Sequence, residues 1–145
     1  MNWKAKKIFE FVIYGAAVPE GRPRVAKAGK FYRVYTPNKT REWKEYVALQ
    51  SLDYRPKSPY ECPIILQLGF YLPRPKSLPK KVVHHTKKPD IENLAKSILD
   101  ALEGIFYKND SQIVHLTIGK YYTTETPCVT VVGVGLFEEK EVKND

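Results

Sequence analysis

Four acids and a lysine within one short stretch are the side chains of this sequence best suited to chemistry. Glu92, Lys96 and Asp100 follow one another at a helical spacing of four residues, Asp90 stands two residues before Glu92, and Asp110 comes ten residues after Asp100. Carboxylates that are brought together repel, and proteins tolerate such groups mainly where protons or a cation neutralise them. Oxygen ligands without His or Cys among them select Mg²⁺ or Mn²⁺. Such a set of acids could polarise a phosphate and generate a metal-bound hydroxide.

Each of these residues also has a purely structural interpretation. Glu92, Lys96 and Asp100 are spaced four residues apart, so they share one helix face and could form ion pairs worth about 0.2–0.5 kcal/mol each. Asp90 stands where the N-cap of a helix is expected, and Asp110 stands at a turn before a strand. The residue types and spacing alone leave open whether these acids bind a metal or stabilise the fold.

The chain is basic, and its charge is divided unevenly along the sequence. The net charge of the 145 residues is +8. Residues 1–89 hold 19 Lys and Arg against 6 Asp and Glu, a net of +13, whereas residues 90–145 hold 5 against 10, a net of −5. Basic side chains that neutralise phosphates release condensed counterions, so this asymmetry favours a polyanionic partner, nucleic acid first. A basic protein whose charge only prevents aggregation is the alternative.

Length and composition predict one domain over residues 1–145, with a frayed tail at 138–145. No apolar run approaches the ~20 residues of a membrane helix, and the charged N-terminus lacks a signal-type apolar core, so we expect a cytoplasmic protein. Cys62 and Cys128 lie in apolar segments without a neighbouring Cys or His. We expect two buried free thiols rather than a disulfide or a zinc site.

Hydrophobic periodicity and turn signals predict the order of the elements. Asp90 is the expected N-cap of the second helix, and Gly104 is expected just after its end. Strands are expected at 8–14, 64–71, 111–122 and 127–137, a short extended pair is expected around 30–35, and helices are expected at 36–52 and 91–103.

Two basic segments accompany these elements. Residues 19–24 form a turn-rich basic loop, and residues 72–89 contain six Lys and Arg but no acid. A long basic loop of this kind is either a solvated surface loop or a functional one that contacts phosphates. The pair His84 and His85 in this loop is expected to be solvated or to contact phosphate. The aromatic candidates for stacking on bases are Phe31, Tyr32 and Tyr71, each of which also suits a core or strand face.

One string extends the interpretation beyond composition and spacing. It runs Lys88-Pro89-Asp90-Ile91-Glu92-Asn93-Leu94-x-Lys96-x-x-Leu99-Asp100-Ala101-Leu102 and continues with Asn109-Asp110-Ser111-Gln112-Ile113 and Lys120. This string resembles the RusA family of Holliday junction resolvases. The resemblance is close over residues 88–120, and the order of the surrounding elements is also similar.

The resemblance implies a small homodimeric endonuclease of the α+β class, one domain with a mixed β-sheet and two main helices packed on it. Such an enzyme uses Mg²⁺, with Mn²⁺ also possible, to nick two strands of a four-way DNA junction symmetrically in recombination and repair. Small resolvases of this family are often carried by phages and prophages. A branched-DNA-binding protein without catalysis, and a nuclease acting on forks or flaps, are the alternatives.

The resemblance also assigns roles to individual residues. Asp90, Glu92 and Asp110 carry over as metal ligands, and Lys96 joins them as a catalytic residue that contacts the scissile phosphate. Asp100 and Asn93 are expected to support them. Glu92 stands where the family has an aspartate, and Asn109 where members often have one. The residues expected to bind DNA are Arg22, Arg24, Lys27, Lys30, Arg33, Arg74, Lys76, Lys80, Lys81, Lys87, Lys88 and Lys120.

Overall fold

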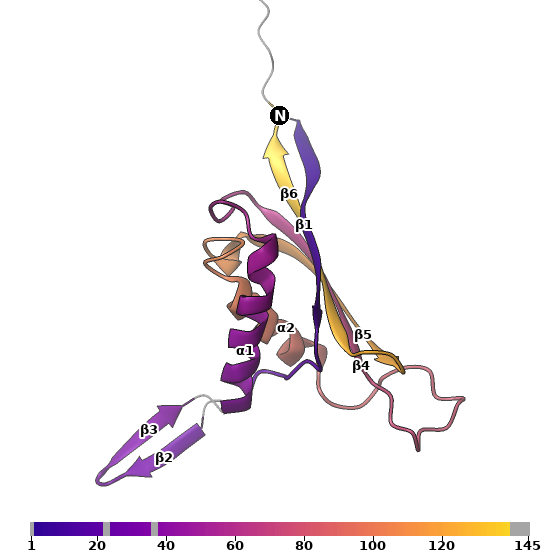
Figure 1. The fold of residues 1–145 in the computed structure, drawn as a ribbon. Coiled ribbons are helices and arrows are strands. Elements are labelled where there is room, and N and C mark those ends of the chain that lie inside the picture. The colour runs from indigo at the N-terminus through magenta and orange to yellow at the C-terminus, as the bar shows by residue number, and fades with distance from the viewer. Residues whose placement is uncertain (1, 22–23, 36–37, 140–145) are drawn as a thin grey trace, which may run out of the picture.

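A mixed four-stranded sheet forms the frame of the molecule, with the strand order β1-β6-β4-β5 (Figure 1). The computed structural model describes residues 2–21, 24–35 and 38–139, apart from the side chains of 24–26, 28 and 31–35. Strand β6 runs antiparallel to both of its neighbours, whereas β4 and β5 are parallel. The strands are β1 (Trp3–Tyr14), β4 (Ile64–Pro73), β5 (Ile113–Thr123) and β6 (Cys128–Glu138).

Two helices, α1 (Asn38–Ser51) and α2 (Ile91–Leu102), cover one face of this sheet and contact each other (Figure 1). Helix α2 lies in the crossover that joins the parallel strands β4 and β5, as parallel pairing requires. The predicted α+β class, with two helices on a mixed sheet, is confirmed. No helix in the described part of the chain is both long and apolar enough to cross a membrane.

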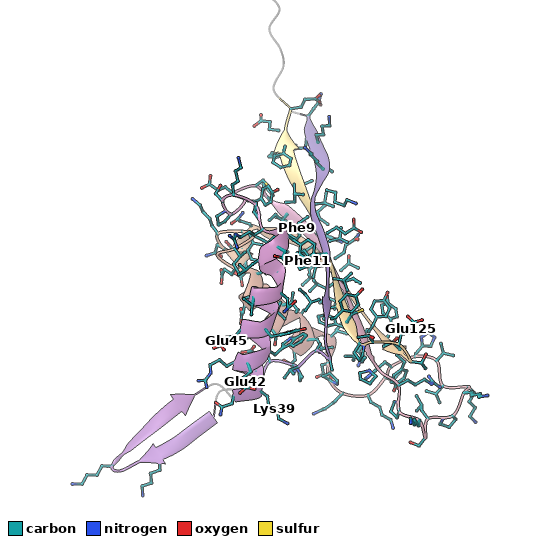
Figure 2. The ribbon with its side chains drawn as sticks, viewed as in Figure 1. Phe9, Phe11, Lys39, Glu42, Glu45 and Glu125 are labelled. Atoms are coloured by element: carbon teal, nitrogen blue, oxygen red, sulfur yellow. The ribbon has the colours of Figure 1, made fainter. Side chains whose placement is uncertain are left out.

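The core lies between the helices and the sheet. Alternate residues of β1 point into it, and the labelled rings of Phe9 and Phe11 lie between β1 and α1 (Figure 2). Gly133 of β6 faces Phe9, and a Cβ at this position would lie 2.2 Å from Cζ of the ring. The aromatic ring therefore occupies the space that the missing side chain leaves.

Strand β1 begins at Trp3, five residues before the strand predicted from residue 8. Residues 3–7 were not predicted as a strand, because Lys4, Lys6 and Lys7 leave this segment with few apolar residues. Such lysines suit an edge strand, where they discourage pairing with other chains. At the other end, Glu138 completes β6 and the backbone N–H of Glu139 donates to the Asn2 carbonyl at 2.8 Å, while residues 140–145 lie outside the described residues.

Strands β2 (Arg24–Ala28) and β3 (Phe31–Tyr35) form a separate two-stranded hairpin. This hairpin arm, the pair that the sequence predicted around residue 30, projects from the end of α1 away from the sheet (Figure 1). Lys27 and Lys30 are exposed on the arm. Within the described residues the two strands pair only with each other.

Candidate active site

Three carboxylates gather at the C-terminal end of α2. Oxygens of Asp100, Glu103 and Asp110, called the acid group below, all lie within 4.8 Å of one another. Asp100 is in the last turn of the helix, and Glu103 is its C-cap residue. Gly104 then takes a φ of +85°, a left-handed conformation that suits glycine, and turns the chain. The donor set of the acid group consists only of oxygens, which suits a hard divalent cation.

A short capped turn brings Asp110 to this group. The side-chain oxygen of Asn109 accepts a hydrogen bond from the backbone N–H of Ser111 at 2.9 Å, and Oε1 of Gln112 accepts one from the backbone N–H of Asn109 at 2.9 Å. Asp110 itself donates its backbone N–H to Oε1 of Glu103 at 3.0 Å. Asn109 therefore fixes the turn, and its neutral amide leaves the carboxylate of Asp110 free to face the group.

Tyr107 is fully buried beside the acid group. Its hydroxyl donates to the carbonyl of Leu99 at 2.6 Å. Burial raises the pKa of Tyr107 far above its ordinary value, and the negative charges of Asp110, Glu103 and Asp100 raise it further. The hydroxyl stays protonated under a concentrated negative potential, which is the potential that attracts a cation.

Lys44 of α1 neutralises part of this charge. Its ammonium lies 3.0 Å from Asp100 and 2.7 Å from Glu20, and so joins both helices to the segment that follows β1. Burial opposes the charge of Lys44, but the hydrogen bonds and charges of Glu20 and Asp100 outweigh burial and raise its pKa. Within the described residues Lys96 pairs with neither Glu92 nor Asp100, so the ladder of ion pairs along α2 does not form.

Asp90 and Glu92 lie at the opposite end of α2. Asp90 is the N-cap residue, yet its side chain makes no capping hydrogen bond, so its carboxylate is free for another role. Ten helical residues separate it from Asp100, a rise of about 15 Å. Asp90 borders a shallow pocket of about 360 Å³ together with Glu20, Lys88 and Asn93. Of the three acids predicted to share an ion, the structure brings Asp110 into the acid group and leaves the other two outside it.

Two cations, one in the sheet and one in the loop, hold the basic loop (residues 74–89) in place. Lys120 of β5 donates to the carbonyls of Lys87 at 2.6 Å and Pro89 at 3.0 Å, just before Asp90. Arg74 donates to the carbonyls of Val82 and Pro79 at 2.6 and 2.8 Å. Both cations thus hold the loop in shape.

Aromatic stacking secures the same loop. The ring centroids of His85 and Tyr122 are 4.4 Å apart, and the guanidinium carbon of Arg74 lies over the ring of Tyr122, 5.4 Å from its centroid. Burial, together with the charge of Lys120, lowers the pKa of His85. His84 is exposed, as expected of a solvated residue. The other five cations of the loop are exposed, namely Lys76, Lys80, Lys81, Lys87 and Lys88.

Several predicted contacts fall outside the described parts of the chain. Arg22 is not among the described residues, and the same holds for the side chains of Arg24, Arg33, Phe31 and Tyr32. Both cysteines are free and half-buried.

Sequence reasoning missed Glu103 and Lys44. The sequence could have pointed to Glu103, because a residue three positions after Asp100 lies on the same face of a helix. No sequence pattern pointed to Lys44, because Lys44 and Asp100 are 56 residues apart in the sequence and lie on different helices. Tertiary packing, rather than spacing, selects it.

Comparison with known proteins decides the family. A family model described as "Endodeoxyribonuclease RusA" matches residues 15–132, a span that includes both ends of α2 and the whole basic loop. The chain belongs to the RusA endodeoxyribonuclease family. It is also 34% identical over 126 residues to the "Uncharacterized protein YqaN" of Bacillus subtilis (strain 168), an alignment that covers 80% of this chain and 89% of that protein.

Membership of the RusA family confirms the resemblance first seen at residues 88–120 and extends it over most of the fold. It indicates an endodeoxyribonuclease with DNA as its substrate. The acid group fits the metal dependence typical of such enzymes, because two oxygens on opposite sides of one Mg²⁺ are about 4.2 Å apart. Small side-chain movements suffice to bring these oxygens around one ion.

Proposed function

We propose that this RusA-family protein is a Mg²⁺-dependent endodeoxyribonuclease that resolves four-way DNA junctions by paired symmetric nicks. The observation that carries the proposal is the family match over a helix that bears carboxylates at both ends. The exposed cations of the basic loop and the hairpin arm would hold the arms of the junction through their phosphates. The ion, when bound, supplies charge stabilisation and an activated water for hydrolysis of the phosphodiester.

The residues proposed to hold the ion are the ligands predicted from the sequence, Asp90, Glu92 and Asp110, to which the structure adds Asp100 and Glu103. Lys96 is exposed on α2 between its two acidic ends, where its ammonium could contact the phosphate. Glu103 also positions Asp110, because its carboxylate accepts a hydrogen bond from the backbone N–H of Asp110.

We propose that the active unit is a homodimer whose two sites each draw on both subunits. The two ends of α2 are about 15 Å apart, too far for one ion to bridge within a protomer in this arrangement. A twofold axis that places the start of one α2 against the acid group of its partner would unite Asp90 and Glu92 with the second subunit's acid group. Two identical sites then result, which suits two nicks in a twofold-symmetric junction.

Mixing two inactive variants tests this shared site. Asp90→Asn and Asp110→Asn should each lose junction cleavage. In a mixed dimer, one site carries both substitutions and the other carries none, so a mixture should recover about a quarter of the wild-type sites, seen as single nicks. Sites confined to one protomer would give no recovery, because every site would then carry a substitution.

Substrate class is tested with end-labelled four-way, forked and linear DNA in Mg²⁺, Mn²⁺ or EDTA. Paired symmetric cuts in the four-way junction support the resolvase. Cuts confined to forks would instead indicate a nuclease that prefers forked DNA. Binding without cuts would indicate a non-catalytic DNA-binding protein. Asp53→Asn is the matched control, since Asp53 is an exposed acid in the short helix after α1.

A further inference from the structure

The face of the sheet opposite the helices is open and carries aromatic and hydroxyl side chains. Because successive strand residues alternate between faces, Tyr71 and Thr130 point away from the buried Phe70 and Val129. Tyr121 on β5 is 50% exposed and Tyr14 on β1 is 61% exposed. In the described residues no helix covers this face, and both helices lie on the other side (Figure 1).

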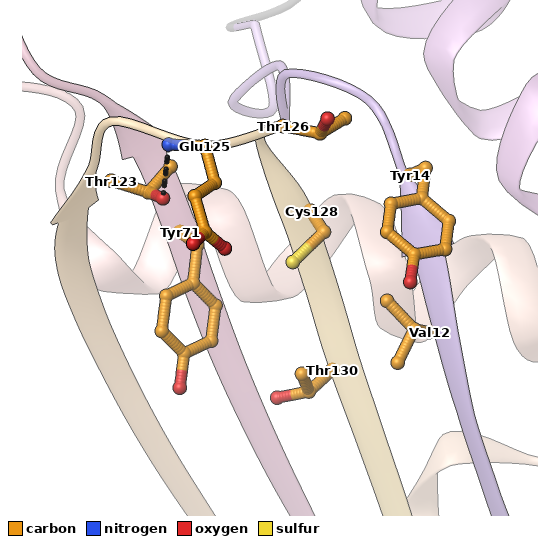
Figure 3. A pocket seen from close by; sticks show the side chains of 8 residues that line it. All are labelled: Val12, Tyr14, Tyr71, Thr123, Glu125, Thr126, Cys128 and Thr130. Atoms are coloured by element: carbon orange, nitrogen blue, oxygen red, sulfur yellow. Dashed lines mark hydrogen bonds between the residues drawn. The ribbon is translucent and has the colours of Figure 1, made fainter.

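Two adjoining pockets hollow this face. One, of about 370 Å³, has Tyr71 and Tyr14 on its two sides, Cys128 and Thr130 between them, and Glu125 pointing in beside Tyr71 (Figure 3). The other, of about 320 Å³, shares Tyr71 and Thr130 with it and extends across the strands to Tyr121. Together they form a continuous groove over β1, β6, β4 and β5.

Two tyrosine rings in the groove lie along the sheet. A Cβ at Gly119 would lie 2.3 Å from the hydroxyl oxygen of Tyr121, so that ring folds back over the glycine. The ring of Tyr71 similarly approaches Gly69, with Cε2 3.4 Å from the position of a Cβ. The two rings stack on each other with centroids 5.2 Å apart and planes 28° apart. Half of Tyr121 remains exposed, and an exposed aromatic face is a surface on which any base can stack.

The rim of the groove is fixed by hydrogen bonds outside it. The backbone N–H of Glu125 donates to Oγ1 of Thr123 at 3.0 Å, and the backbone N–H of Gly15 donates to the carbonyl of Pro127 at 2.8 Å. The hydroxyl of Tyr46 on α1 donates to the carbonyl of Tyr14. These hydrogen bonds position Tyr14 and the turn that carries Glu125 without the help of a ligand.

The charges of the groove select its ligand. Its lining includes no Lys or Arg, and Glu125 is its only carboxylate. The basic loop leaves β4 immediately after this face, and the backbone N–H of Arg74 donates to the carbonyl of Thr123 at 2.9 Å, so cations and groove are joined at one end of the sheet. A groove of aromatic rings with one carboxylate, next to a loop that carries exposed lysines, matches a strand whose bases and phosphates are recognised separately.

We propose that this groove binds unpaired nucleotides of the DNA substrate, stacked on Tyr71 and Tyr121, with an amino-bearing base beside Glu125. The carboxylate accepts a hydrogen bond from the exocyclic amine of cytosine, adenine or guanine. Thymine instead presents carbonyl oxygens on either side of its N–H, and these repel a carboxylate. The inference rests on the proposal that DNA is the substrate, and adds a binding site on the far face of the sheet from α2.

Binding without cleavage tests the groove. Fluorescence anisotropy in EDTA would measure the affinity of labelled oligo-dC, oligo-dA and oligo-dT of equal length. We expect Tyr121→Ala to weaken binding of all three by about five- to hundredfold, the effect of losing one stacked base, and Tyr121→Phe to retain it. Wild-type protein should prefer oligo-dC and oligo-dA over oligo-dT by about fivefold or more, and Glu125→Gln should abolish this preference.

The controls are matched changes on the helix side. Glu45→Gln alters an exposed acid on α1, labelled in Figure 2, and Leu49→Ala removes an exposed apolar side chain of the same helix. Unchanged affinity in both Tyr121→Ala and Glu125→Gln would overturn the groove. Loss of dimerisation with unchanged affinity, seen by sedimentation, would also overturn it and assign the face to a second copy of the chain.

Junction cleavage by the wild-type protein in Mg²⁺ separates this inference from the proposed function. If the protein shows the expected oligonucleotide preferences but cuts no branched DNA, the groove proposal stands and the resolvase proposal is wrong. If it cuts junctions but the groove variants bind every oligonucleotide like the wild type, the resolvase proposal stands and the groove proposal is wrong.

Discussion

Asp110→Asn should change the stability of the protein in opposite directions with and without a metal. The three carboxylates of the acid group lie within 4.8 Å of one another, and only Asp100 has a cation from α1 beside it. In EDTA the substitution removes two repulsive pairs. Each pair is worth about 0.9 kcal/mol at this distance in the dielectric of water, and less once salt screens it.

The expected gain in EDTA is therefore about 1 kcal/mol of unfolding free energy, or a rise in Tm of about 2–4 °C for a domain of this size. The backbone N–H of Asp110 keeps its bond to Glu103, so the turn itself is preserved. Raising the salt concentration should shrink the gain, because screening weakens repulsion between exposed charges.

In Mg²⁺ the order should reverse. An ion that binds only the folded wild-type protein stabilises it by about 2.7 kcal/mol at a concentration of one hundred times its Kd. The variant, which lacks one ligand, should gain little. Thermal unfolding followed by circular dichroism, with and without Mg²⁺, measures both effects, and Asp53→Asn serves as the control. Equal stabilisation of both proteins by Mg²⁺, or a variant less stable than the wild type in EDTA, would refute the reasoning.

Three further predictions concern the core, the buried tyrosine and the basic loop. Gly133→Ala should destabilise the fold by about 1–3 kcal/mol in urea unfolding, because its Cβ would meet the ring of Phe9, and Phe9→Leu in the same chain should recover part of the loss; additive losses would contradict this. Because burial raises the pKa of Tyr107, stability should be complete below about pH 10, the pKa of an unfolded tyrosine, and fall as the pH rises above it. Tyr107→Phe, at a cost of about 1 kcal/mol for the lost hydrogen bond, should flatten this alkaline fall in urea titrations, and an unchanged slope would count against it. Lys120→Met should loosen the end of the basic loop by about 1–3 kcal/mol, seen as faster amide hydrogen exchange and slower junction cleavage, whereas Lys4→Met on the edge strand should do neither.

The elements with strong periodicity were predictable from the sequence. Helix α2 begins at Ile91 as expected and ends one residue before the predicted end, because its apolar face and the following glycine both mark it. Strand β4 begins at the predicted residue and extends to Pro73. The start of β1 was missed because a strand at a sheet edge can be stabilised by pairing alone, with lysines on its surface.

The grouping of the acids was less predictable. Spacing along a helix places Glu92, Lys96 and Asp100 on one face, but it carries no information on which end of the helix a later turn approaches. The capped turn at Asn109 returns the chain to the C-terminal end of α2, beside Glu103. Asn109 caps this turn through its side-chain oxygen, a role that aspartate fills equally well, so capping does not explain why asparagine stands here.

The basic residues show a similar limit. We expected every cation of the basic loop, and Lys120 of β5, to bind DNA, but Arg74 and Lys120 donate to backbone carbonyls within the protein. Arg74 and Lys120 hold the loop, whereas Lys76 and its exposed neighbours face solvent. Hydrogen bonds from a side chain to the main chain leave no pattern in the sequence. Only the fold therefore distinguishes the cations that hold the loop from those that face solvent.

The pairing of the first and last strands has a practical consequence for experiments. Trp3 pairs with Glu138, so the described ends of β1 and β6 emerge together, at the end of the sheet farthest from the basic loop and the hairpin arm (Figure 1). A fluorophore or surface tether attached near either end would lie far from the loops that are expected to meet DNA. Single-molecule measurements could therefore hold the protein by this end while a junction approaches from the other.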